Sequence, residues 1–304
     1  MSGQNPRNYT GYAGNPPRVQ WPGNARLALS VVLNYEEGAE RCVLHGDEES
    51  ESFLSELSNA QPRHGMRHLS IESVYEYGSR VGVWRLRSLF RQYKVPVTVF
   101  AVGMAAERNP QAVRALFEDG HEICSHGYRW IDYQQVDEDT ERDHIQRAIK
   151  SIQAIIGERP LGWYTGRTGP NTTRLVAEEG GFLYHCDDYS DDLPFWDTGF
   201  DPPQLVIPYT LDANDMRFCA TGGFTTGSDF YRYLKDSFDV LYAEGAQQPG
   251  MMSVGLHCRI AGRPGRFGAV ERFLKYVRSH DDVWMARRVD IARHWRTHHP
   301  PESA

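Results

Sequence analysis

The sequence lacks the cysteine patterns that stabilise small secreted domains or bind zinc. Its five cysteines form no CxxC pair and are odd in number, so neither a disulfide framework nor a thiolate zinc site is indicated. No apolar run approaches the roughly 20 residues of a membrane-spanning helix. These absences favour an ordinary globular protein. The cysteines are Cys42, Cys124, Cys186, Cys219 and Cys258.

An excess of positive charge is also missing. The chain has 33 Lys and Arg residues against 40 Asp and Glu residues, which gives a formal net charge of -7. Nucleic acids and anionic membranes are bound through broad cationic surfaces. We therefore expect neither of them as a partner, and expect a small-molecule substrate instead.

Common nucleotide-binding and nucleophile motifs are absent too. No expected strand leads into a GxGxxG or GxxxxGK[ST] loop, and neither a GxSxG elbow nor a Cys-His nucleophile signature occurs. Chemistry in this chain must therefore come from other polar side chains.

The N-terminal residues 1–24 are polar and rich in glycine and proline, which predicts an extended arm in front of one catalytic domain over residues 25–304. They lack the charged start and apolar core of a secretory signal, so we expect a cytoplasmic protein. Three aromatic residues of the arm, Tyr9, Tyr12 and Trp21, need a packing surface. It lies either on the same domain or on a neighbouring subunit.

Apolar segments typical of buried strands alternate with segments of helical periodicity from Arg26 to the C-terminus. Strands regularly separated by helices imply a parallel sheet. Seven or eight such units predict an α/β fold with a single distorted (β/α) barrel, and an open doubly wound sheet is the alternative. The expected strands cover 27–33, 95–102, 121–126, 161–165, 182–186, 204–208 and 251–257. The expected helices cover 70–94, 109–118, 137–156, 171–180, 228–246, 268–280 and 289–295, with Asn171 as a helix cap.

Polar residues directly follow several expected strands, where the site of a β/α barrel is assembled. A carboxylate can take a proton from water, a histidine can give one to a leaving nitrogen, and an arginine can hold an oxyanion. The set thus predicts a hydrolase, although a strand-end histidine is often only structural and the Asp run 187–192 could be a polar turn. The candidates are Asn34, Glu36, Glu37, Ser125, His126, Arg167, Asn171, Asp187, Asp188, Asp191, Asp192, His257 and Arg259.

Three of the strand ends carry a resemblance to a known family. The segment His121-Glu-Ile-Cys-Ser-His126 resembles the HEIGSH element of the polysaccharide deacetylase (NodB-like) superfamily. Glu36 and Glu37 stand where that family keeps an Asp-Asp pair, and Leu256-His257 is similar to its final catalytic histidine motif. Longer motifs over 33–38, 125–130, 162–171 and 255–264 resemble one branch, the allantoinases. That resemblance implies a homotetramer that hydrolyses (S)-allantoin to allantoate in purine degradation.

One position departs from the parent deacetylases, which hold a divalent metal with an aspartate and the two histidines of an HxxxH element. Four residues after His126 this chain has Trp130. A catalytic site of this kind usually needs three protein ligands, so we expect no cofactor. The alternative is one divalent metal such as zinc near His126, with an acid such as Asp187 as the replacement ligand. Trp130 also suits a small planar ring better than a long glycan.

The residues and the resemblance together suggest catalytic roles. Glu36 or Glu37 would activate water, His257 would protonate the leaving ring nitrogen, and His126 would orient water or substrate. Competing functions are a metal-dependent polysaccharide N-deacetylase, another small cyclic amide hydrolase and a non-catalytic binding protein. The expected substrate-binding residues are Asn34, Trp130, Arg167, Asn171, Asp187 and Arg259.

Overall fold

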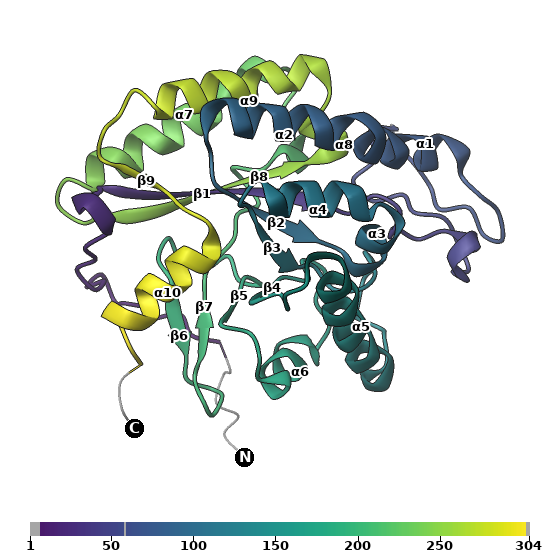
Figure 1. The fold of residues 1–304 in the computed structure, drawn as a ribbon, viewed down its shortest axis with the longest axis horizontal. Coiled ribbons are helices and arrows are strands. Elements are labelled where there is room, and N and C mark those ends of the chain that lie inside the picture. The colour runs from purple at the N-terminus through teal and green to yellow at the C-terminus, as the bar shows by residue number, and fades with distance from the viewer. Residues whose placement is uncertain (1–6, 58, 302–304) are drawn as a thin grey trace.

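A computed structural model describes residues 7–57 and 59–301 of the chain (Figure 1). A curled sheet forms its centre, and strands along this sheet follow the order β6-β7-β5-β4-β3-β2-β1-β8, with β9 paired to β1 off this path. This architecture confirms the predicted distorted β/α barrel. The strands are β1 (Leu27–Tyr35), β2 (Val97–Ala101), β3 (Glu122–Ser125), β4 (Gly162–Trp163), β5 (Tyr184–His185), β6 (Phe195–Asp197), β7 (Gln204–Val206), β8 (Gly250–His257) and β9 (Val283–Met285).

Helices surround this sheet. Figure 1 shows α2, α7 and α9 together over the part of the sheet formed by β1, β2 and β8. The helices are α1 (Leu69–Tyr77), α2 (Val83–Tyr93), α3 (Gly103–Arg108), α4 (Pro110–Glu118), α5 (Glu138–Ile156), α6 (Thr172–Glu179), α7 (Gly227–Glu244), α8 (Cys258–Ala261), α9 (Pro264–Val277) and α10 (Arg288–His298). Within residues 7–57 and 59–301, none is long and apolar enough to cross a membrane.

Strand β1 is buried along its whole length because both of its faces are covered. Leu29, Val31 and Leu33 pack in the core cluster shared with the helices. Ala28 and Val32 alternate with them and belong to the cluster inside the barrel. A near-continuous apolar run is the pattern expected of a parallel strand between two layers.

Helix α10 closes the end of the barrel where the strands begin. Its first turn donates the Arg288 backbone N–H to Thr98 Oγ1 (2.7 Å) and the Val289 N–H to Glu122 Oε2 (2.9 Å), at the starts of β2 and β3. Trp295 of the same helix is buried in the cluster inside the barrel. The carboxyl ends of the strands, at the opposite end, remain available for a site.

Several local predictions need correction. Helix α9 begins at Pro264 and not at Gly268, because proline is pre-organised for a first helical turn. Asn171 does precede α6, but its side chain accepts no bond from that helix's backbone N–H groups. Helices α3 and α8 and strand β6 were not expected, and β6 runs antiparallel to β7.

Part of the N-terminal arm packs on the same chain. The indole of Trp21 is buried, lies 5.6 Å from the Trp284 ring and donates to the Gly250 carbonyl (2.8 Å). The hydroxyl of Tyr12 donates to the Pro194 carbonyl (2.7 Å). Residues 1–6 of the predicted arm lie outside the described residues.

The barrel has a seam between β7 and β8, where these strands do not pair along the sheet. The fully buried guanidinium of Arg288 spans this seam. Its Nη2 donates to the carbonyls of Ile207 (2.5 Å) and Pro208 (2.6 Å), and its Nη1 donates to Ser253 Oγ (2.9 Å). One side chain therefore replaces missing ladder hydrogen bonds.

We expect Arg288→Met to destabilise the fold by about 3 kcal/mol or more, since it leaves several buried acceptors unpaired and each can cost roughly 1–3 kcal/mol. Urea unfolding measures the loss. The neighbouring Arg287→Met is the control, because Arg287 makes a partly exposed ion pair with Asp290 and an exposed hydrogen bond to the Gly120 carbonyl (3.2 Å), and exposed pairs contribute about 1 kcal/mol at most. Equal stability of the two variants would contradict the seam role of Arg288.

Candidate active site

Three strands bring Glu36, His126 and His257 to one point. Strand β1 pairs in parallel with β8, so that Asn34 lies beside His257. On its other side β1 pairs with β2, which in turn pairs with β3, so that Tyr35 and Ser125 end the two strands that flank β2 and both lie beside Ala101. Side chains directly after these strand ends converge, as parallel topology requires.

The carboxylate of Glu36 is the centre of this cluster. Its Oε1 lies 3.4 Å from His126 Nε2 and 3.4 Å from His257 Nε2. All three side chains are at most 5 % exposed. These three candidates are therefore brought together as predicted, in a site shielded from bulk water.

Asp215 is a member of the site that was not predicted. Its Oδ1 lies 2.6 Å from His257 Nδ1, and its Oδ2 accepts the backbone N–H groups of His257 (2.8 Å) and Ala261 (2.9 Å). It begins a short 3₁₀ helix, Asp215–Cys219, in the connection after β7. Its only sequence signal is that it follows a strand, at a distance of several residues.

Neighbouring charges set the protonation states of Glu36 and His257 by shifting their pKa values in opposite directions. Burial lowers the pKa of His257, but the negative charges of Glu36 and Asp215 and its hydrogen bonds to both raise the pKa to about 9. Burial raises the pKa of Glu36, but Arg259 and the two histidines outweigh it and hold the pKa well below its ordinary value. The imidazolium and the carboxylate are thus both charged at neutral pH.

Glu37 lies beside Arg259, with its Oε1 4.0 Å from Arg259 Nη1. Its oxygens accept the backbone N–H groups of Glu36 (3.0 Å) and Arg259 (3.2 Å), and among the described residues no bond joins it to either histidine. Burial raises the pKa of Glu37, the positive charge of Arg259 lowers it, and the negative charge of Glu36 raises it. The resulting pKa is about 7. It packs so closely on Gly78 that a Cβ there would lie 2.2 Å from Glu37 Oε1.

Arg259 is fully buried beside the catalytic cluster. Its Nη1 donates to Glu36 Oε2 (2.6 Å), and its guanidinium carbon lies 4.3 Å from the Tyr75 ring centre and 5.2 Å from that of Trp130. Within the described part of the chain, its Nε and Nη2 atoms are buried without a hydrogen-bond partner. These donors are available to a polar ligand.

Trp130 forms a wall shared by two arginines. Its ring stacks on Phe53 with centres 5.9 Å apart, and Arg167 lies over both rings, 4.9 Å from Phe53 and 5.2 Å from Trp130. Arg167 Nη1 also lies 3.4 Å from Glu51 Oε2. Arg167 and Trp130 are therefore brought to the same side of the site as Arg259.

The other expected binding residues have protein partners. The amide of Asn34 donates to Tyr209 Oη (3.0 Å), inside the barrel. Asp187 accepts the backbone N–H groups of Thr165 and Gly166, which shapes the loop after β4.

Asn171 is occupied elsewhere. It accepts a bond from Arg174 Nη2 (3.2 Å) at the start of α6, and no bond among the described residues links it to Glu36, His126 or His257.

The side chains do not fit the metal site of the parent deacetylases. Trp130 supplies no ligating atom in place of the second histidine, and Arg259 puts a permanent positive charge on Glu36. Asp187, the alternative ligand, uses its oxygens on loop amides. No group of three or more His, Cys, Asp or Glu side chains is arranged to hold a metal within 7–57 and 59–301.

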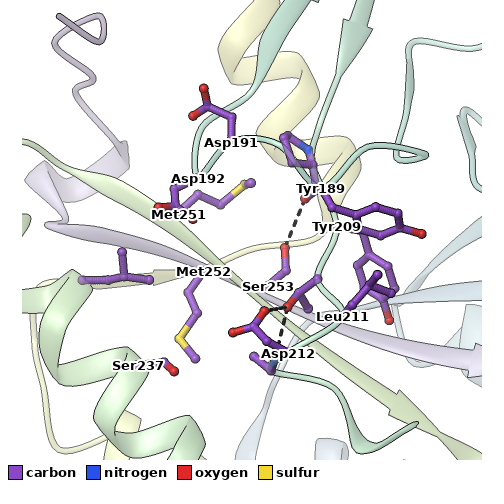
Figure 2. A pocket seen from close by; sticks show the side chains of 14 residues that line it. Tyr189, Asp191, Asp192, Tyr209, Leu211, Asp212, Ser237, Met251, Met252 and Ser253 are labelled. Atoms are coloured by element: carbon purple, nitrogen blue, oxygen red, sulfur yellow. Dashed lines mark hydrogen bonds between the residues drawn. The ribbon is translucent and has the colours of Figure 1, made fainter. Parts of the chain in front are cut away.

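A pocket of about 280 Å³ lies between β8 and the segment that follows β7. Figure 2 shows the side chains that line it. Asp191 and Asp192 line it together with Tyr209 and Ser253. Both aspartates therefore line this pocket, and no hydrogen bond or ion pair among the described residues joins either of them to a histidine. Tyr209 separates the two regions, since its hydroxyl bonds to Asn34 inside the barrel.

The chain belongs to the polysaccharide deacetylase family of hydrolases. Residues 66–184 match the Polysaccharide deacetylase family. A Schizosaccharomyces pombe protein designated a polysaccharide deacetylase is 43% identical over 313 residues, which cover 97% of this chain and 98% of that protein.

Two solved structures are similar over nearly the whole chain. The crystal structure of PuuE allantoinase has a TM-score of 0.96 and 62% identity, and the match covers 98% of this chain and 99% of that one. The structure of a Pseudomonas aeruginosa PAO1 protein designated a polysaccharide deacetylase has a TM-score of 0.96 and 64% identity, with 97% and 99% covered.

Proposed function

We propose that this protein is an allantoinase, which opens the hydantoin ring of (S)-allantoin to give allantoate. The observation that carries the proposal is the Glu36 carboxylate shared by two histidines, beside Trp130 where the parent family has a metal ligand. The 62% identity to PuuE allantoinase supports the choice of substrate.

In the proposed reaction, water lies at Glu36 Oε1 and attacks the ring amide carbonyl. Glu36 takes one proton from this water as the C–O bond forms. His126, whose Nε2 faces the same oxygen, orients the water. Because the pKa of Glu36 is low, it holds the proton only briefly.

His257 serves as the general acid. Its raised pKa keeps it protonated at neutral pH, and it donates that proton to the ring nitrogen as the C–N bond breaks. Glu36 lies 3.4 Å away and returns the water-derived proton to His257. One water is consumed, and the product acid then ionises to the carboxylate.

Arg259 stabilises the oxyanion that forms on the attacked carbonyl. Its unpartnered Nε and Nη2 groups and its fixed charge lie in a site without bulk water, where such donors act strongly. A lost oxyanion donor typically costs roughly 3 to 4 kcal/mol of transition-state stabilisation. No step of this mechanism requires a metal.

Trp130 and Arg167 would select the substrate. The indole provides a flat wall for a planar ring, and Arg167 can pair with a carbonyl oxygen or with the forming carboxylate.

The test is allantoate formation from racemic allantoin by purified protein, with elemental analysis and a repeat after chelation. We expect turnover of one enantiomer that chelator leaves unchanged. Turnover that chelator abolishes would favour the alternative, a metal-dependent deacetylase, and an N-acetylated glycan would be assayed beside allantoin to distinguish the two. Ligand binding without turnover of either would leave a non-catalytic protein.

A further inference from the structure

The connection between β1 and α1 places a buried carboxylate beside Arg167. Glu51 is only 3 % exposed, although it belongs to an acidic stretch of this connection. Its Oε1 accepts the backbone N–H groups of Ser52 (2.9 Å) and Phe53 (2.8 Å). Its Oε2 lies 3.4 Å from Arg167 Nη1, which is longer than the roughly 2.7–2.9 Å of a close charge-assisted hydrogen bond. Among the described residues Oε2 has no other partner, so it can accept from a ligand.

Arg167 also has hydrogen-bonding capacity left. Within the described part of the chain its guanidinium makes no hydrogen bond besides the one to Glu51, although a guanidinium has several N–H donors. Its side chain is 20 % exposed. The faces of the Phe53 and Trp130 rings hold the guanidinium in place, at 4.9 Å and 5.2 Å from its carbon atom. Its remaining donors are therefore both fixed and accessible.

This pair lies away from the reacting centre. No hydrogen bond or ion pair among the described residues joins Arg167 to Glu36 or to either catalytic histidine, whereas Arg259 donates directly to Glu36 (2.6 Å). Both guanidinium carbons lie 5.2 Å from the centre of the Trp130 ring. A substrate whose reacting amide lies at Glu36 therefore reaches Arg167 only with a group that projects from its ring.

We propose that Glu51 and Arg167 form a subsite for the ureido side chain of allantoin, an assignment that rests on the proposed function. A ureido group has one carbonyl acceptor and several N–H donors. Arg167 complements the carbonyl and Glu51 Oε2 complements the N–H groups, so the pair matches both ends of this neutral group. The carboxylate formed by ring opening stays at Glu36 and Arg259, which leaves the side-chain carbonyl to Arg167.

The test is the steady-state kinetics of Glu51→Gln on allantoin. The amide oxygen can still accept the backbone N–H groups of Ser52 and Phe53, so the variant should fold, and circular dichroism checks this. Its NH₂ group cannot accept from the ureido group. We expect KM to rise roughly tenfold or more with kcat nearly unchanged, because a hydrogen bond to a charged group is lost equally from bound substrate and transition state.

The matched control is Glu49→Gln, two residues earlier in the same connection. Glu49 pairs with Arg41 (3.0 Å) and His64 (3.3 Å), and no bond among the described residues links it to Arg167. We expect an unchanged KM in this variant. An equal rise of KM in both variants would show that only the order of the connection matters, and would overturn the subsite.

Hydantoin, which has the ring without the ureido side chain, tests which part of the substrate Glu51 binds. We expect it to inhibit the unmodified enzyme and Glu51→Gln equally. An unchanged KM for allantoin in Glu51→Gln, or weaker inhibition of that variant by hydantoin, would overturn the subsite while the allantoinase activity of the unmodified protein stands. Absence of that activity would overturn the proposed function itself, and the subsite with it.

Discussion

Replacing Glu36 with glutamine is expected to lower kcat for ring opening by roughly 10²- to 10⁴-fold, the usual contribution of a general base. The amide keeps the shape of the side chain but cannot take a proton from water. It also weakens the contacts that Glu36 Oε1 makes with His126 and His257. Steady-state kinetics on allantoin measure the effect, and circular dichroism checks that the variant is folded.

Glu37→Gln is the matched comparison. Because the pKa of Glu37 is about 7, this carboxyl is partly neutral at working pH, and glutamine resembles its protonated form. We expect a loss of less than about tenfold, below the range for a general base. A larger loss in Glu37→Gln than in Glu36→Gln would reverse the assignment of the base.

Asp215→Asn is expected to lower kcat by a similar factor, roughly 10²- to 10⁴-fold, because it removes the partner that holds His257 and keeps it protonated. The charge of Asp215 is one cause of the raised pKa of His257, so the pKa should fall in the variant. The alkaline limb of the kcat/KM profile, expected near pH 9 in the unmodified enzyme, should move to lower pH. A merely structural role for Asp215 would reduce activity without moving that limb.

The free energy of unfolding should also depend on the protonation of His257. The folded-state pKa of His257 is about 9, above its ordinary value of 6.5, so the stabilisation from its protonation is complete below about pH 6.5 and is lost as pH rises through about 9. Urea unfolding at several pH values measures this dependence. Asp212→Asn is the control, because Asp212 bonds to Thr210 and Tyr233 and, among the described residues, to no histidine. The slope above pH 7 should weaken in Asp215→Asn only.

Much of the site is predictable because parallel strands bring their carboxyl ends to one edge. Reading the residues after each apolar segment is enough to select Glu36, His126 and His257, which lie together in the structure. The same reading selects Asn171, Asp191 and Asp192, which do not join them. Strand-end position identifies the edge of the sheet but not the direction in which each side chain points.

Alternation along a strand ends with the strand, so the sequence cannot distinguish Glu36 from Glu37. The packing of the two side chains distinguishes them. Glu37 lies against Gly78 and the backbone of Arg259, and Glu36 points to the histidines.

The sequence alone therefore determines the barrel, the edge that carries the site and the loss of one parent ligand at Trp130. The barrel and the edge of the site follow from periodicity, which is a local property of the chain, and the lost ligand follows from the resemblance to the deacetylases. Tertiary structure decides the pairing of Asp215 with His257, which are 42 residues apart, and the placement of Arg259 between two carboxylates and two aromatic rings. Such contacts form where an irregular connection packs against the end of the sheet. The periodicity of the sequence does not predict the position of such a connection.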